Sequence, residues 1–394
     1  MYIKQLLTIT IPFFLSVFLQ LNANETDNFE KYVKSENIHK LKLLLKDNKN
    51  LVKHQLNLPT KYHRKAKVPV ICWAASLGKT EVIPLLVKHG ASLQEKGENP
   101  LTLIPLTIIG FAAQNGHLET VKDLIRQGAK SESKYSDEFY EAAINGQVKV
   151  ARFLLTEIKN INQKPDLRDA FFDSVNAAQV EIVKLIAETG IDVNVKNEIG
   201  LYTIHFAAWR GHLELVKLLA KNGAKLNLEI ESKAESFKGK NILHFAAESG
   251  NHELVAYLIK QKVNYRPSLH EVTPLHIAAS SGYAKIIDQL IAYGAKANEL
   301  KEGRSPLYMA ASYGHVKACE LLIKHGANVN YKNEQGDTAL SRAAISRPKK
   351  DDDKSKKAYL ECAKLLLKHG AKISPRDIKF ASSEEMKKLL EQHK

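Results

Sequence analysis

The apolar residues of this chain recur in blocks that share one pattern. Each block holds a short apolar segment with a pair of alanines and, three residues later, a glycine. A longer segment follows, and its apolar residues are spaced i, i+3 and i+4, as in Leu213, Val216, Leu218 and Leu219. This spacing is that of an amphipathic helix with one buried face. The pattern therefore predicts helix pairs that must stack on one another, because one isolated pair cannot cover its own apolar face.

The paired alanines give the period of the pattern. The first alanine of the pair, or the residue in its place, stands at positions 74, 112, 142, 174, 207, 246, 278, 310 and 343. Successive blocks are therefore 30 to 39 residues apart, which indicates a tandem-repeat protein with a period near 33.

Residues 273–279 read TPLHIAA and residues 305–311 read SPLYMAA. These segments resemble the signature of the ankyrin-repeat family, and the resemblance covers roughly residues 28–394. It implies an all-α fold, an ankyrin-repeat solenoid of stacked helix-turn-helix units joined by hairpin-like loops. We divide the chain into a signal peptide, residues 1–23, and a solenoid, residues 24–394. The solenoid holds about nine to ten repeats, with worn capping repeats at both ends.

Glycines and histidines occupy fixed columns of the repeats. Gly282 and Gly294 represent the two glycine columns, where each helix is expected to end with positive φ. The resemblance implies that His205, His244 and His276 are internal struts, which hydrogen-bond the preceding threonine and the backbone of the turn. These histidines are one repeat apart, so they cannot share a metal ion.

Several segments break the pattern. Ala178 replaces the first glycine of its repeat and Ile158 replaces the second one in the repeat before, so we expect a different local backbone there. At the far end, Ser382 and Glu385 have the spacing of a capping box.

Two inserts carry basic residues. The first, within residues 48–68, predicts a basic loop with Lys61, Arg64, Lys65 and Lys67, and the second, residues 347–357, includes Lys349 and Lys350. The first insert is either a docking element or a solvated loop, and the second is expected to be a mobile, solvated charge run.

The overall charge adds a constraint on partners. The chain has 58 Lys and Arg against 43 Asp and Glu, a formal net charge of +15. Most of the basic residues are Lys, whereas Arg is the residue that suits phosphates and base edges. We therefore expect a soluble, Lys-coated surface and no nucleic-acid binding, while an acidic protein or an anionic membrane surface stays open as a partner.

The three cysteines, Cys72, Cys319 and Cys362, fit neither a zinc site nor a disulfide framework. We expect them to be small core residues, with a disulfide between Cys319 and Cys362 as the open alternative.

The first 23 residues predict export. One Lys precedes the apolar run of residues 6–21, and Ala23 follows as a small residue at its end, which is typical of a secretory signal peptide. The run is shorter than a usual membrane span. We expect cleavage near Ala23, transient membrane contact only, and a periplasmic or secreted protein, delivered in one scenario to a host cell. A retained membrane anchor is the alternative.

No enzyme is expected. The sequence contains none of the common nucleophile, metalloprotease, phosphate-binding or dinucleotide-binding motifs. We therefore predict no catalytic residue, no metal and no cofactor. A hidden enzyme is kept as a third class of function behind the two binding functions below.

The remaining candidate is a binding surface. The resemblance implies a concave face made by the hairpin tips and by the two residues after each alanine pair. The partner-binding residues that we predict there are Trp209, Arg210, Ile199, Leu201, Glu248, Ser280, Ser281, Ser312 and Tyr313. Exposed Trp and Arg are enriched in interface hot spots. The alternative for Trp209 is packing over an adjacent loop.

The leading function is thus a non-enzymatic protein–protein interaction scaffold, which binds a protein partner of unknown identity as a monomer. The alternative is a basic surface-attachment protein that binds anionic membrane or glycan through its Lys-rich loops. Ionic strength distinguishes the two, because charge-driven attachment weakens steeply with salt.

Overall fold

The structure is a computed structural model that describes residues 25–60, 65–133, 136–160, 167–231, 234, 236–266, 272–345 and 353–394. The predicted signal peptide and four basic-loop residues, Lys61, Arg64, Lys349 and Lys350, lie outside the described residues. No helix in the described ranges combines the length and the apolar character that crossing a membrane requires.

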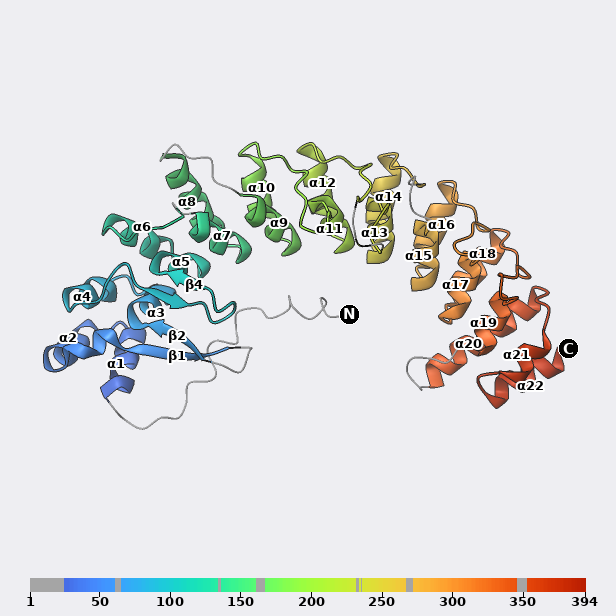
Figure 1. The fold of residues 1–394 in the computed structure, drawn as a ribbon, viewed down its shortest axis with the longest axis horizontal. Helices are drawn as coiled ribbons and strands as arrows, with labels where there is room; N and C mark the ends of the chain where they lie inside the picture. The colour runs from blue at the N-terminus through green and yellow to red at the C-terminus, as the bar shows by residue number, and fades with distance from the viewer. Residues whose placement is uncertain are drawn as a thin grey trace. The chain divides into compact units, whose positions relative to one another are not determined.

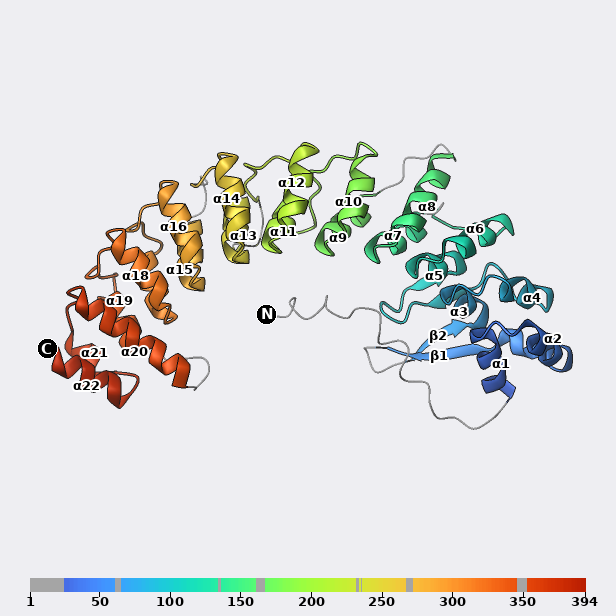
Figure 2. The same cartoon turned by 180° about the vertical axis from the view of Figure 1, so that it is seen from behind.

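The chain forms two compact units, Met1–Asp192 and Val193–Lys394. Helix pairs repeat along both units, and within each unit the helices lie side by side in two rows (Figures 1 and 2).

The first helix of each pair is short and carries the alanine pair. In unit 1 these helices are α3 (Val70–Ser76), α5 (Ile108–Gln114), α7 (Ser136–Ile144) and α9 (Arg168–Asn176). In unit 2 they are α11 (Thr203–Trp209), α13 (Ile242–Ser249), α15 (Pro274–Ser281), α17 (Pro306–Ser312) and α19 (Ala339–Ile345). Within each unit every first helix packs against the next one. The alanine pairs are fully buried, because their small side chains let neighbouring backbones approach closely.

The second helix of each pair forms the other row. In unit 1 these helices are α4 (Val82–Lys88), α6 (Leu118–Arg126), α8 (Val148–Asn160) and α10 (Val180–Ala187). In unit 2 they are α12 (Leu213–Lys221), α14 (His252–Lys260), α16 (Ala284–Ala292), α18 (Val316–Lys324) and α20 (Asp353–Lys368). Leu290 represents their buried stripe, with no exposed surface. Where Ile158 replaces the glycine, α8 continues to Asn160, so the backbone differs there as the sequence predicts.

Further helices flank the repeats. At the start lie α1 (Glu25–Lys34), α2 (Ile38–Asp47) and the 3₁₀ helix η2 (Lys49–Lys53), and at the end lie α21 (Pro375–Lys379) and α22 (Glu384–Gln392). The predicted N-cap of α22 is wrong by one residue: Ser383, not Ser382, accepts the backbone N–H of Met386. The backbone N–H of Ser382 instead donates to the carbonyl of Ala344, which ties this segment to α19.

Unit 1 adds two small β-hairpins to the otherwise helical fold. Strands β1 (Gln55–Pro59) and β2 (Lys65–Pro69) pair antiparallel, and β3 (Lys96–Glu98) pairs in the same way with β4 (Pro105–Thr107). The predicted basic loop is therefore a β-hairpin on both sides of residues 61–64. Its burial alternates, because successive side chains of a strand point to opposite faces: Ala66 is buried, while Lys65 and Lys67 are exposed.

The second insert is in part helical. Residues 353–357 of the charged run form the first turns of α20, where Asp353 places a negative charge at the helix N-terminus. That charge is favourable beside the partial positive charge of the first turn.

Polar side chains link successive hairpins. Asn298 donates from Nδ2 to the carbonyl of Gly326 at 2.8 Å and accepts the backbone N–H of Asn328 at Oδ1 at 2.6 Å. Asn330 makes the same pair of contacts with Gly370 and Lys372. The glycine carbonyls that terminate the second helices are thereby satisfied by the preceding repeat.

The first glycine column has a second requirement besides positive φ. A side chain from the following repeat covers these glycines: a Cβ placed on Gly282 would lie 2.6 Å from Nδ1 of His315, and one on Gly78 would lie 2.5 Å from Nδ1 of His117. Ala178 shows what a side chain does in this column. We expected a different backbone there, and this is wrong, because Ala178 keeps the left-handed conformation with φ of 59°.

Candidate protein-binding surface

Helix α11 presents aromatic residues that come together with the segment before α13. Trp209 lies at the end of α11, half-buried, with its ring centroid 6.0 Å from Phe206, 6.0 Å from Phe237 and 6.1 Å from Phe245. Phe206 and Phe237 are also half-buried, whereas Phe245 is fully buried beneath them. We call these four residues the Trp209 cluster. Trp209 thus packs over an adjacent segment, as the alternative interpretation predicts, and still keeps part of its indole exposed.

A lysine lies against the same rings. The Nζ atom of Lys240 is 5.7 Å from the centroid of Phe237 and 5.9 Å from that of Phe245, within cation–π range. Burial lowers the pKa of Lys240, while the charge of Glu248 opposes this shift. Within the described residues Glu248 acts on Lys240 through its charge alone, and Lys240 forms no ion pair.

The histidine beneath the cluster differs from its counterparts. His244 bonds the side chain of Asn241 at 2.8 Å and donates to the carbonyl of Val272 at 2.7 Å, so it forms the predicted strut with an asparagine in the place of the expected threonine. His205 is fully buried between Tyr202 and Phe245, but within the described residues neither of its ring nitrogens has a hydrogen-bond partner. Burial lowers its pKa to about 4, and the backbone of Leu228, which lies nearby without a hydrogen bond of ordinary geometry, opposes this shift.

The local sequence explains the loss. Tyr202 takes the N-cap position of α11 and makes no side-chain cap hydrogen bond, whereas Asn241 and Thr273 cap α13 and α15. In the next two repeats, Nε2 of the histidine bonds the carbonyl of the residue before the following N-cap. For His205 that residue is Lys240, whose carbonyl accepts the backbone N–H of Ile230 instead. The strut prediction therefore holds for His244 and His276 and is wrong for His205.

The structure separates the predicted hairpin residues. Ile199 stands at the hairpin tip before α11 and is 44% exposed. Leu201 was predicted to join it on the surface, and this is wrong, because Leu201 has no exposed surface. The hairpin folds back between Asn197 and Leu201, with both the backbone and the side chain of Asn197 bonded to Leu201. This bond pair turns the Leu201 side chain into the core.

The other predicted residues lie on successive first helices of unit 2, which pack side by side. Arg210 is half-buried, Glu248 is exposed, and Tyr313 is 48% exposed with its ring 6.2 Å from that of His315. Ser280, Ser281 and Ser312 are half-buried. The hydroxyls of Ser280 and Ser312 donate to the carbonyls of Ile277 and Tyr308 in their own helices, so each keeps only its acceptor capacity for a partner. We call Trp209, Arg210, Ile199, Glu248, Ser280, Ser281, Ser312 and Tyr313 the candidate surface.

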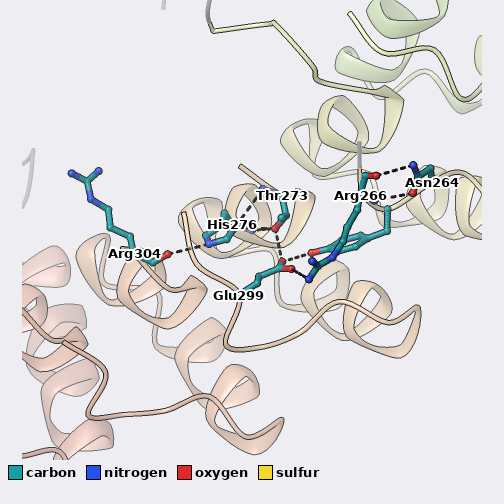
Figure 3. Close-up of polar contacts among 7 residues, drawn as sticks. Asn264, Arg266, Thr273, His276, Glu299 and Arg304 are labelled. Carbon is teal, nitrogen blue, oxygen red and sulfur yellow. Dashed lines mark hydrogen bonds and ion pairs between the residues drawn. The ribbon is translucent and has the colours of Figure 1, made fainter. Parts of the chain in front are cut away.

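A polar network holds the hairpins of the next repeats together (Figure 3). The carboxylate of Glu299 is 6% exposed and accepts hydrogen bonds from the hydroxyls of Thr273 and Tyr265, and from Arg266 at 3.3 Å. His276 contacts Thr273 through Nδ1 and donates from Nε2 to the carbonyl of Arg304 at 3.1 Å. The buried imidazole has both nitrogens occupied, and burial lowers its pKa to about 4. This arrangement fixes hairpins to helices and offers no accessible base.

The thiols and acidic groups fit a structural role as well. Cys72, Cys319 and Cys362 are buried free thiols. Burial raises the pKa of Cys72, and a hydrogen bond with Cys362 raises that of Cys319. In the ranges that the structure describes, no group of three or more His, Cys, Asp or Glu side chains is arranged to hold a metal ion.

Sequence reasoning missed three members of the Trp209 cluster and the lysine beside it. Phe206 and Phe245 precede the alanine pairs of α11 and α13, a position that is also apolar in other repeats, so nothing distinguished them. Phe237 and Lys240 belong to the longer segment between α12 and α13. The 39-residue spacing from Ala207 to Ala246 was the available signal for them.

The stacked helix pairs, the glycine columns and the histidine struts define a helical repeat protein. Family comparison gives the same class. Two family models of ankyrin repeats match this chain. The model described as ankyrin repeats (3 copies) matches residues 204–301 and 289–377, and the model described as ankyrin repeats (many copies) matches residues 172–220. Together they span more than half of the chain, which therefore belongs to the ankyrin-repeat family.

Curated relatives share the repeats over limited stretches. The chain is 29% identical over 179 residues to the ankyrin repeat and KH domain-containing protein mask-1 of Caenorhabditis elegans, a match of 45% of this chain and 6% of that protein. It is 30% identical over 162 residues to a transient receptor potential cation channel subfamily A member 1 homolog of the same organism, covering 40% of this chain and 13% of the other. A putative ankyrin repeat protein of fowlpox virus is 26% identical over 221 residues, covering 47% and 38%. The chain thus spans well under half of the length of these relatives.

Ankyrin repeats are in general protein–protein interaction modules, and membership in this family points to a non-catalytic interaction domain. The repeats of this chain accordingly suggest protein partners.

Proposed function

We propose that this protein is an exported, non-enzymatic scaffold that binds a protein partner through the candidate surface of unit 2. The observation that carries the proposal is the Trp209 cluster, which has three half-buried rings, two on α11 and one on the segment before α13. Large amphipathic rings held in place by their neighbours lose little entropy on binding, which is why Trp is enriched in interface hot spots. Ile199 and Tyr313 add exposed apolar area on the same unit.

The test replaces exposed residues rather than Trp209 itself. Trp209→Ala would remove contacts with three rings, so a loss of binding could follow from a loss of folding. Ile199→Ser with Tyr313→Ala removes exposed apolar side chains and should leave the free energy of unfolding within about 0.5 kcal/mol for each change. Phe380→Ser is the matched control, because Phe380 is 51% exposed and lies outside the candidate surface.

The assay is a crosslinking pull-down in the native organism. The double variant should recover about tenfold less of the partner that the wild-type chain captures, and Phe380→Ser should recover the wild-type amount. Equal recovery by the double variant and the wild-type chain would contradict the assignment of this surface.

The export part of the proposal depends on residues 1–23. N-terminal sequencing of the protein from the native organism should find a mature chain that begins near residue 24, outside the cytoplasm. An uncleaved chain in the membrane fraction would favour the anchor alternative.

The alternative function, attachment to anionic membrane or glycan, is favoured by one observation in unit 1. Lys65 and Lys67 are both exposed on the same face of β2, where they form a small basic strip. Vesicles that contain anionic lipid should then bind the chain at low salt and release it at high salt. The double variant Lys65→Gln with Lys67→Gln should bind these vesicles more weakly than the wild-type chain. If the double variant and the wild-type chain bind equally, the strip has no such role.

A further inference from the structure

The segment between α12 and α13 carries a cation beside an apolar surface. Lys240 places its ammonium group near the rings of Phe237 and Phe245, and Trp209 contacts the same two rings. Burial disfavours the charged ammonium, and the described part of the chain offers it no ion-pair partner. Glu248 attracts this ammonium without forming an ion pair, and Lys301 repels it. A partly buried cation that lacks an ion-pair partner is stabilised by an anion that a partner brings.

The indole N–H of Trp209 is a second donor at this place. Within the described residues Trp209 makes ring contacts only, so its Nε1–H donates to no protein acceptor. The Trp209 cluster thus has a neutral donor on one of its own rings and a charged donor beside it, since the Trp209 ring and the Lys240 ammonium both lie near the rings of Phe237 and Phe245. A carboxylate is the one common protein side chain that accepts from both kinds of donor and also neutralises the ammonium.

The core beneath the cluster is a second, independent reason to place a binding site at this repeat. His205 stacks on Phe245, and neither ring nitrogen makes a hydrogen bond of ordinary geometry, although the backbone of Leu228 is close enough to affect its pKa. His244 and His276 of the next two repeats are fully bonded. A local arrangement that gives up hydrogen bonds made by its neighbours marks a place where the sequence is not selected for stability alone. The same repeat supplies Trp209 and contacts Phe237.

We infer that the Trp209 cluster with Lys240 recognises an acidic peptide segment of the protein partner, in which a carboxylate stands next to an apolar side chain. The carboxylate pairs with Lys240 and accepts the indole N–H of Trp209, and the apolar side chain covers the exposed ring surfaces of Trp209 and Phe237. The formal net charge of +15 favours the approach of such an acidic segment. This inference rests on the proposed function, and it adds the chemistry of the partner.

The probe is a library of random peptides displayed on phage and selected on the full chain. The selected peptides should carry Asp or Glu beside an aliphatic or aromatic residue. Synthetic copies should bind Lys240→Met about tenfold more weakly than wild type, because Met keeps the apolar stem and removes the charge. Lys240→Arg should retain binding.

Lys285→Met is the matched control, because Lys285 is exposed on α16 and has no part in the cluster. It should bind the peptides as the wild-type chain does. A selection that yields no acidic residue, equal affinity of the wild-type chain and Lys240→Met, or no selected peptide at all would overturn the inference. None of these results decides the proposed function, which depends on the pull-down with Ile199→Ser and Tyr313→Ala.

Discussion

Gly282 combines two constraints that a single substitution can separate. It ends α15 with φ of 74°, and the ring of His315 lies over the position of a Cβ atom at 2.6 to 3.0 Å. Gly326 has a similar φ of 82°, but nothing lies within 4 Å of a Cβ placed there. The pair therefore distinguishes the cost of a left-handed backbone from the cost of a steric clash.

The two alanine substitutions should therefore lower the free energy of unfolding by different amounts. Gly326→Ala should lower the free energy of unfolding by about 1–2 kcal/mol, which is the cost of a left-handed residue with a side chain. Gly282→Ala should cost that amount and a further 1–3 kcal/mol or so, because the methyl group overpacks against His315. The displaced ring also weakens its 3.0 Å hydrogen bond to the carbonyl of Ser280, a bond that contributes about 1 kcal/mol.

Removal of the ring tests the steric part. In Gly282→Ala with His315→Ala, the combined loss should be smaller than the sum of the two single losses by about 1–3 kcal/mol. Urea unfolding followed by circular dichroism gives the energies, and peptide-resolved hydrogen exchange assigns them to α15 through α18. The reasoning is refuted if Gly282→Ala is no worse than Gly326→Ala, or if the two losses simply add.

Three further substitutions test other parts of the structure. Ala178→Gly should raise the free energy of unfolding of unit 1 by roughly 1 kcal/mol, seen as a higher urea midpoint, because glycine adopts the positive φ of this position without strain. Burial, and then the charge of Asp137, raise the pKa of Glu141 to about 7, so its contribution to stability falls as pH rises from 4.5 to 7. Glu141→Gln should therefore stabilise unit 1 at pH 8, by at most about 3 kcal/mol, with the gain shrinking toward pH 5. His205→Phe should stabilise unit 2 at pH 7. It should also reduce the loss of stability of unit 2 between pH 6.5 and 4, since a lowered histidine pKa weakens folding as pH falls. His276→Phe removes the hydrogen bond to the Arg304 carbonyl and should therefore destabilise unit 2. Equal urea midpoints for the two histidine variants, or no pH dependence of the Glu141→Gln effect, would contradict the respective arguments.

The repeat pattern predicts most of the fold because each of its letters has a local physical cause. Pro274 sets φ at the first turn of α15, Gly282 ends that helix, and Thr273 caps it through its hydroxyl. These effects act within a few residues, so they are readable from the sequence. The error at Ser382 has the same origin: adjacent serines both suit an N-cap, and the bond of the Ser382 N–H to Ala344 decides between them.

The candidate surface was harder to predict, because exposure depends on neighbours that are distant in the sequence. Leu201 and Ile199 look alike as apolar hairpin residues, yet the fold of the hairpin around Asn197 buries one and exposes the other. Phe237 reaches Trp209 only because an irregular segment folds back onto α11. A segment without the repeat pattern carries no periodic signal for its side-chain directions.

The repeat that begins at α11 is where several departures coincide. Its histidine lacks both bonds, its N-cap position is a tyrosine that does not cap, and the segment that follows is longer than in the neighbouring repeats. A drifting sequence would be expected to lose bonds without gaining anything, but here each change adds a ring or a charge to one place: Tyr202 packs on His205, Phe237 packs on Trp209, and Lys240 joins the rings. The loss of core hydrogen bonds together with partly exposed aromatic and cationic groups is consistent with the proposed binding role, because functional sites commonly give up stability. The adjacent repeats of α13 and α15, with complete struts and capped helices, provide the rigid support that such a surface needs.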